Sequence, residues 1–173
     1  MAAFTPMMQQ YLDIKNQYKD CIMFYRVGDF YEMFFDDALT ASKALEITLT
    51  GKDCGQEERA PMCGVPFHAY EVYANRLIEQ GYKVAICEQV EDPKQAKGLV
   101  KRDVIQIITP GTNLSTQNLK EGQNNYIMSI YAFDNAYGIA VADITTGEAR
   151  TCQVTSQEKC KDEINKYQPS EII

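Results

Sequence analysis

The sequence predicts an α/β protein built from two parts. Along residues 1–112, segments with the spacing of a helix alternate with β-rich runs, a pattern typical of a mixed sheet with flanking helices. Residues 113–125 are almost wholly polar, which indicates a linker. Residues 126–173 then show three evenly spaced strand patterns and one helix. We therefore expect one complete domain, a linker, and the first part of a second domain.

Length and composition exclude several classes of protein. The chain has 173 residues, enough to bury a full core without disulfides or metal. No run approaches the roughly 18 apolar residues of a membrane span. The N-terminus also lacks the basic flank of a signal peptide. Without a membrane span or a signal peptide, we expect a cytoplasmic location and no membrane partner. The six cysteines contain no C-x-x-C pair, so we expect reduced thiols and no metal site.

The first elements follow from capping and turn chemistry. Thr5 can cap a helix and Pro6 fits its first position, which predicts a helix over 5–18. The run 21–27 is β-rich and stops at Gly28-Asp29. Glycine at the first central position suits a type II′ hairpin turn, so 30–35 is predicted to be the returning strand.

The next segments carry mixed signals. Two aspartates open a predicted helix over 36–45, where they face its positive end. A short strand is expected at 47–50, followed by an exposed polar loop at 51–59. Two prolines and a glycine within 61–68 argue against a long regular element there.

The remaining elements of the first part have clearer patterns. Apolar residues at helical spacing predict a helix from 70 that ends near Gly81. Strands are predicted at 82–90 and 104–109. Between them lies the most basic stretch of the chain, which contains no acid over 93–102 and carries Lys94, Lys97, Lys101 and Arg102.

The second part begins as a β-meander. Strands are predicted at 126–133, 137–144 and 148–154, and a helix at 156–167. The last residues, 171–173, begin another apolar run. We expect this to be the start of a strand and the chain to be part of a longer protein whose second domain is truncated here.

A search for catalytic patterns is negative. The chain has no phosphate-binding G-x-x-x-x-G-K-[ST] loop, no G-x-G-x-x-G and no G-x-S-x-G. The single His68 has only Cys63 nearby in sequence, and nothing orients either group. We therefore expect no catalytic residue and no enzyme activity in this chain. An alternative is a metal-dependent nuclease, with Asp134 or Asp143 of the meander binding the metal; acids in turns are more often solvated.

The hairpin around Gly28 is more informative. In the predicted strand Phe30 and Glu32 share one face, while Tyr31 and Met33 share the other. An aromatic ring beside a carboxylate at a tight turn can stack on a base and accept a hydrogen bond from its edge. Spacing alone favours the simpler interpretation, in which Phe30 packs in the core and Glu32 is a surface charge.

Several motifs in register resemble the N-terminal region of the MutS family of DNA mismatch-repair proteins. The resemblance covers residues 5–112 and is looser from 126 onward, where Ala142-Asp-Ile-Thr-Thr-Gly-Glu148 is similar to the start of the family's RNase H-like connector domain. The motifs are Thr5-Pro-Met-Met-Gln-Gln-Tyr-Leu12, Phe24-Tyr-Arg-Val-Gly-Asp-Phe-Tyr-Glu-Met-Phe-Phe-Asp-Asp-Ala38, Pro61-Met-Cys-Gly-Val-Pro-Phe-His-Ala69, Val84-Ala-Ile-Cys-Glu-Gln-Val90, Asp92-Pro93 and Ile108-Thr-Pro-Gly-Thr112.

The resemblance implies roles for particular residues. Phe30 would wedge into the duplex and stack on a mispaired base, and Glu32 would hydrogen-bond that base. Lys52 and Met62 would belong to segments that contact the DNA backbone, although some family members have arginine at the position of Lys52. The function implied is recognition of mispaired or unpaired bases in double-stranded DNA.

The resemblance also implies properties of a longer parent protein. That parent would be a bacterial, cytoplasmic, nucleoid-associated homodimeric ATPase that uses ATP and Mg²⁺ and acts with a MutL-type repair protein. No cofactor is implied for the present chain. Residues 1–111 carry 12 basic and 16 acidic side chains, so we expect other parts of the parent to supply most phosphate contacts.

Overall fold

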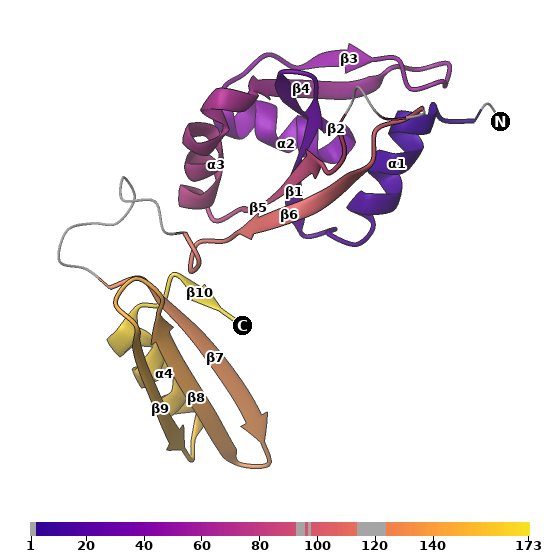
Figure 1. Cartoon of the computed structure of the whole chain (residues 1–173). Coiled ribbons are helices and arrows are strands. Elements are labelled where there is room, and N and C mark those ends of the chain that lie inside the picture. The colour runs from indigo at the N-terminus through magenta and orange to yellow at the C-terminus, as the bar shows by residue number, and fades with distance from the viewer. Residues whose placement is uncertain (1–2, 93–95, 97, 114–123) are drawn as a thin grey trace. The chain divides into compact units, whose positions relative to one another are not determined.

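The computed structural model describes residues 3–92, 96, 98–113 and 124–173 (Figure 1). The chain divides into two compact units, Met1–Ile108 and Thr109–Ile173. Each unit contains one mixed sheet, covered by several helices in the first unit and by α4 in the second. The predicted α/β fold class is confirmed.

The first unit is organised around a six-stranded sheet of order β3-β4-β2-β1-β5-β6. Strands β1 and β5 run parallel, and every other neighbouring pair is antiparallel. The elements are α1 (Pro6–Lys15), β1 (Cys21–Val27), β2 (Phe30–Phe34), α2 (Phe35–Leu45), β3 (Thr50–Lys52), β4 (Ala60–Pro66), η1 (Phe67–Ala69), α3 (Tyr70–Glu79), β5 (Lys83–Gln89) and β6 (Arg102–Ile108).

Local sequence signals explain the helix ends. The Thr5 hydroxyl accepts a hydrogen bond from the Met8 amide, and Pro6 occupies the first position of α1, as predicted. Two acids lie in the first turn of α2, where the helix dipole favours negative charge. Helix α3 is followed by Gly81 at φ +87°, a conformation that glycine adopts without strain.

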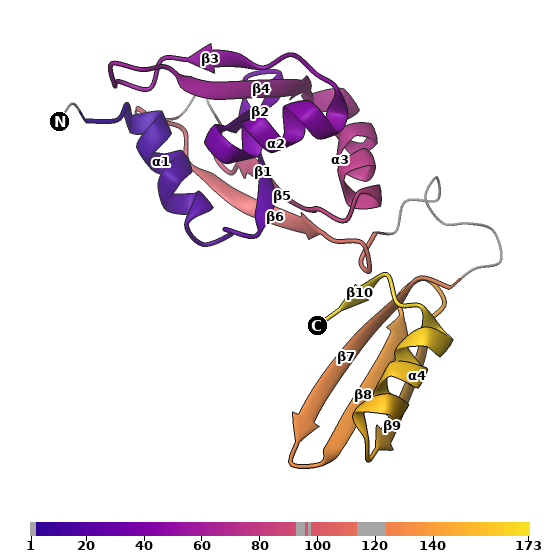
Figure 2. The ribbon, with the colours of Figure 1, turned by 180° about the vertical axis from the view of Figure 1, so that it is seen from behind.

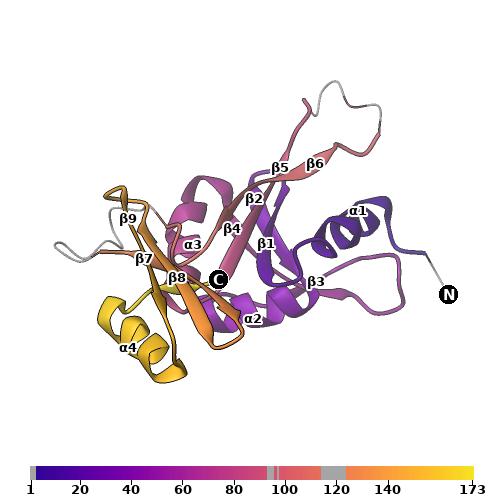
Figure 3. The ribbon, with the colours of Figure 1, turned by 90° about the horizontal axis from the view of Figure 1, so that it is seen from below.

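The helices cover the two faces of this sheet unequally. Helices α2 and α3 pack on one face over a core that includes Phe24, Tyr31 and Met33. Helix α1 packs on the other face, where Met8 and Tyr11 cover the inner parts of β1 and β2. Figure 3 shows α1 and α3 on opposite sides of the strands. We call the residues packed around Met8 and Tyr11, among them Tyr25 and Phe34, the α1 core cluster. Phe30, at the start of β2, is not part of it.

Two predictions for this region are wrong. Residues 47–49 lie in no strand, because the pairing with β4 begins only at Thr50 and continues to Lys52. Residues 60–66 form a full strand despite Pro61 and Pro66. These prolines stand near the two ends of β4, where a missing N–H disturbs the ladder least.

The second unit is a four-stranded sheet of order β10-β7-β8-β9, in which β10 pairs parallel with β7. Helix α4 lies behind this sheet in Figure 1 and in front of it in Figure 2, so it covers one face. It packs over Met128, Ile139 and Val141 through Cys160. The predicted meander and helix are confirmed as β7 (Tyr126–Phe133), β8 (Ala136–Asp143), β9 (Glu148–Val154), α4 (Gln157–Tyr167) and β10 (Glu171–Ile172).

Candidate functional site

The turn between β1 and β2 is the tight hairpin that the sequence predicts. Val27 pairs with Phe30, which leaves two residues in the turn. Gly28 has a φ of +58° and Asp29 has no positive φ, as a type II′ turn requires. The turn therefore begins β2 at Phe30, directly at the edge of the molecule's first unit.

Phe30 does not pack in the core. Its side chain is 49% exposed, whereas Tyr31 and Met33 are 3% and 0% exposed on the opposite face. Alternation along β2 thus follows the prediction, but the simpler interpretation of Phe30 as a core residue is wrong. The ring of Phe30 is therefore available for contact with a partner molecule.

The residues of β4 directly across from Phe30 and Glu32 have small side chains or none. Pro66 lies across from Phe30, and Gly64 lies across from Glu32. A Cβ atom at Gly64 would be 3.3 Å from the Tyr31 carbonyl oxygen and 3.6 Å from Glu32 Cγ. Because Gly64 has no side chain, the position on β4 directly across from Glu32 leaves its side chain uncovered.

Glu32 and Lys52 form an ion pair between β2 and β3. The side chains are 13% and 27% exposed, so the pair is only partly in contact with solvent. The ammonium of Lys52 also lies 5.8 Å from the centre of the Phe34 ring. The structure therefore brings two of the predicted site residues together and gives the Glu32 charge a partner within the protein.

Met62 has a different environment. It lies across from Phe34 on one side and Thr50 on the other. Its side chain is half-buried and packs against the α1 core cluster. Met62 shares the face of Phe30 and Glu32, but its side chain supports the sheet below α1.

The basic stretch offers fewer free charges than its sequence suggests. Arg102 is 8% exposed. Its guanidinium donates to the Arg26 carbonyl at 2.7 Å and to Gln10 Oε1 at 3.1 Å, and it lies 4.9 Å from the centre of the Tyr25 ring. Arg102 thus connects β6 to β1 and to α1. Lys94 and Lys97 lie outside the described residues.

Asp143, one acid of the nuclease alternative, is part of a turn. Its carboxylate accepts hydrogen bonds from the Thr145 amide at 2.8 Å and the Asn125 amide at 3.2 Å. Burial acts to raise the pKa of Asp143, but the hydrogen bond from the Thr145 hydroxyl at 2.6 Å and those from the backbone amides outweigh it and leave the pKa below its ordinary value. Within the described residues, no three His, Cys, Asp or Glu side chains gather as metal ligands would.

A network behind the turn was not identified from the sequence. Arg26 lies across from Tyr31, on the face opposite Phe30, and its guanidinium bonds to Glu88 at 3.1 Å. The Tyr31 hydroxyl donates to the same Glu88 oxygen at 2.7 Å. The two-residue turn predicts that Arg26 and Tyr31 are neighbours. Nothing local to the hairpin indicates Glu88, which is 62 residues from Arg26.

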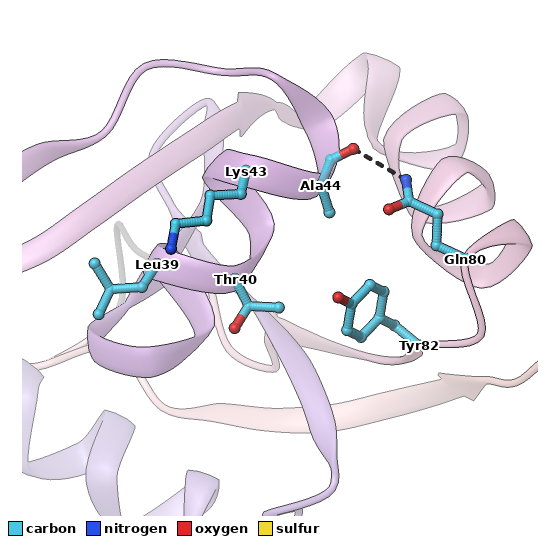
Figure 4. A pocket seen from close by; sticks show the side chains of 6 residues that line it. All are labelled: Leu39, Thr40, Lys43, Ala44, Gln80 and Tyr82. Atoms are coloured by element: carbon cyan, nitrogen blue, oxygen red, sulfur yellow. Dashed lines mark hydrogen bonds between the residues drawn. The ribbon is translucent and has the colours of Figure 1, made fainter.

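An open hollow of about 430 Å³ lies away from these residues. Figure 4 shows its lining, in which the Gln80 amide donates to the Ala44 carbonyl at 3.0 Å. The hollow is formed by α2 and the segment between α3 and β5, which pack on the other face of the sheet from Phe30. It contains none of the candidate site residues.

Comparison with known proteins identifies the class. Residues 5–117 match the family model described as MutS domain I, and residues 125–173 match that described as MutS domain II. The two α/β units therefore correspond to MutS domain I and MutS domain II. In the described residues no helix is long and apolar enough to cross a membrane.

The chain belongs to the MutS family. It is 67% identical to the DNA mismatch repair protein MutS of Lachnoclostridium phytofermentans and 65% identical to that of Acetivibrio thermocellus, with the whole chain covered in both comparisons. A third relative, from Ruminiclostridium cellulolyticum, is 64% identical over the whole chain. The chain spans only about one fifth of the length of these relatives, 19–20%.

Proposed function

We propose that this chain recognises mispaired or unpaired bases in double-stranded DNA. The observation that carries the proposal is the exposed ring of Phe30 at the tip of a tight hairpin, 49% accessible in a chain of the MutS family. Glu32 lies on the same face two residues away. In this proposal Phe30 stacks on the base and Glu32 hydrogen-bonds its edge.

Recognition of this kind depends on DNA deformation. Different mismatches share no single pattern of donors and acceptors, so a general sensor must respond to how easily the site unstacks and kinks. An apolar wedge between base steps costs a few kcal/mol in unstacking, and less where pairing is already faulty. Stacking on Phe30 returns about 1–3 kcal/mol for any base. Preference for a mismatch then equals the difference in deformation cost.

The Glu32–Lys52 pair adds a second element of discrimination. A carboxylate brought near the phosphates of an intact duplex is repelled unless it finds a donor. Lys52 offsets that charge in the free protein. At a distorted site an exposed base edge can take over as the partner of Glu32, which releases Lys52 toward the backbone.

The parent protein is proposed to add what this chain lacks. The phosphate-binding motif of an ATPase is absent from the sequence, so an ATP and Mg²⁺ site would lie elsewhere in the parent. Homodimerisation, a MutL-type partner and a cytoplasmic, nucleoid-associated location are further proposals. The excess of acids in residues 1–111 supports a division of labour, in which this chain supplies the probe and other parts grip the phosphates.

The test measures binding of the full-length parent to fluorescent duplexes by anisotropy. The duplexes carry a G·T pair or an unpaired T and are compared with a matched duplex of otherwise identical sequence. We expect a preference of about tenfold or more for the defective duplexes, equivalent to ~1.4 kcal/mol. Equal affinities would refute the proposal. Cleavage of either duplex by the present chain with Mg²⁺ would instead support the nuclease alternative.

Glu32→Ala is expected to raise affinity for the matched duplex by about three- to tenfold, because it removes a repelled charge and frees Lys52. Lys52→Met, its partner variant, leaves Glu32 unpaired and is expected to weaken binding to every duplex and to lower the salt slope. Anisotropy titrations at two salt concentrations measure both effects. A Glu32→Ala variant with unchanged affinity for both the matched and the mismatched duplex would show that the carboxylate has no discriminating role.

A further inference from the structure

The two carbonyl oxygens of the hairpin turn are each held by a group outside the turn. The Arg26 guanidinium donates to the Gly28 carbonyl at 2.5 Å. The Phe67 amide, at the start of η1, donates to the Asp29 carbonyl at 2.9 Å. A two-residue turn on an otherwise open face is thus fixed at both of its central peptides.

Arg26 connects this turn to three other elements. Its guanidinium carbon lies 3.9 Å from the centre of the Phe67 ring and 5.6 Å from the centre of the Tyr31 ring. The same group bonds to Glu88 on β5 at 3.1 Å. A planar guanidinium can make a forked hydrogen bond and a stacking contact together, which an ammonium group cannot.

Glu88 completes the network. One of its carboxylate oxygens accepts from both Arg26 and the Tyr31 hydroxyl. Burial, followed by the hydrogen bond to Glu88, raises the pKa of Tyr31 well above its usual value, so the hydroxyl remains a donor at neutral pH. Tyr31 directly follows Phe30 and points to the opposite face. The hydrogen bond from Tyr31 to Glu88 therefore fixes β2 at the residue next to the exposed ring.

We infer that Arg26 and Glu88 are positioning residues for Phe30. They act through the turn and through Tyr31 and do not touch the DNA. A ring held in one orientation can unstack the duplex without first being ordered. A mobile ring must lose conformational entropy on binding, which lowers the affinity. The inference rests on the proposed function, because it explains how a stacking ring keeps its direction on an open face.

The network predicts a measurable loss of order when Arg26 is replaced. In the 173-residue chain, Arg26→Lys is expected to speed hydrogen exchange of the Phe67 amide by about tenfold and to lower the heteronuclear NOE of Asp29 and Phe30. Glu88→Gln, which keeps an acceptor for Tyr31, is expected to give a smaller change in the same direction. Asp20→Asn is the matched control, because Asp20 and Lys83 pair at 3.3 Å at the other end of β1 and β5.

The same variants in the full-length parent test the effect on DNA. Arg26→Lys is expected to lower affinity for the mismatched duplex by about three- to tenfold, the range for ordering a side chain on binding. Affinity for the matched duplex and the melting temperature should stay close to wild type, and Asp20→Asn should change nothing. If Arg26→Lys fails to fold, Glu88→Gln carries the test.

The outcomes separate this inference from the proposed function. If Phe30→Ala abolishes mismatch preference but folded Arg26→Lys and Glu88→Gln leave both the exchange of Phe67 and the preference unchanged, the positioning role is wrong and the proposed function stands. If Phe30→Ala leaves the preference intact, the proposed function itself fails. Loosened exchange together with reduced preference supports the inference.

Discussion

Phe30→Ala is expected to lower affinity for a mismatched duplex by about 10- to 100-fold. The lost stacking of the ring on a base is worth about 1–3 kcal/mol, and each tenfold change in affinity is ~1.4 kcal/mol. Affinity for the matched duplex should change less than about threefold, because backbone contacts dominate there. Anisotropy titrations of the full-length parent with both duplexes measure the two affinities.

The position of Phe30 makes this variant a clean probe. The ring is half-exposed at a turn, so its removal leaves no cavity in the core. Phe133→Ala is a matched control, because Phe133 is 71% exposed on the second sheet. Phe133→Ala should leave both affinities unchanged. If Phe30→Ala lowered the affinity for the matched duplex as much as that for the mismatched duplex, stacking by Phe30 would not be the source of the preference.

Asp37→Ala is expected to lower the free energy of unfolding of the first unit by about 3 kcal/mol. The Asp37 side chain is 10% exposed and bonds to Lys15 Nζ at 2.9 Å. It also accepts from the Met23 amide at 3.0 Å and the Tyr11 hydroxyl at 3.3 Å, which joins α2 to β1 and α1. Removing one partner of a buried charged network leaves the others unsatisfied.

The Tyr11 hydroxyl, one of the donors to Asp37, stays protonated. Burial, and then the negative charge of Asp37, raise the pKa of Tyr11 far above its usual value, so its hydroxyl stays protonated. Urea unfolding followed by circular dichroism measures the effect. Asp36→Ala is the control, because Asp36 is exposed on the same helical turn and contributes about 0.3–1 kcal/mol through the helix dipole. Equal losses in the two variants would show that the buried network adds no stability.

Local sequence patterns predicted most of the secondary structure because the signals are themselves local. Thr5 and Pro6 start α1, and the Gly28-Asp29 turn sets the pairing of β1 with β2. Strand β4 escaped prediction because its pairing partners, β2 and β3, decide its conformation despite two prolines. The boundary of β3 was misplaced for the same reason.

The exposure of Phe30 could not follow from alternation along β2. Tyr25 and Phe34 lie on the same face as Phe30, and both are buried under α1. Where that face becomes open depends on the extent of α1, which a strand pattern does not contain. Alternation therefore places Phe30 and Glu32 together but leaves their environment undecided.

The ion pairs between site residues could not be predicted from the sequence either. Glu32 and Lys52 were both proposed as site residues, yet their ion pair depends on β3 and β4 folding beside β2. Arg26 and Glu88 meet because β1 and β5 are parallel neighbours, a contact that brings distant segments together. Electrostatic partners of this kind follow from topology and not from spacing along the chain.

Photocrosslinking from the position of Phe30 shows whether its ring lies against the mispaired base. The full-length parent is prepared with p-azidophenylalanine in place of Phe30, bound to a duplex with one G·T pair, and illuminated, and the crosslinked nucleotide is mapped. The proposed function predicts crosslinks at the mispaired nucleotide and its immediate neighbours, and none at the corresponding position of a matched duplex. Crosslinks spread evenly along both duplexes, or confined to sites away from the mismatch, would contradict it.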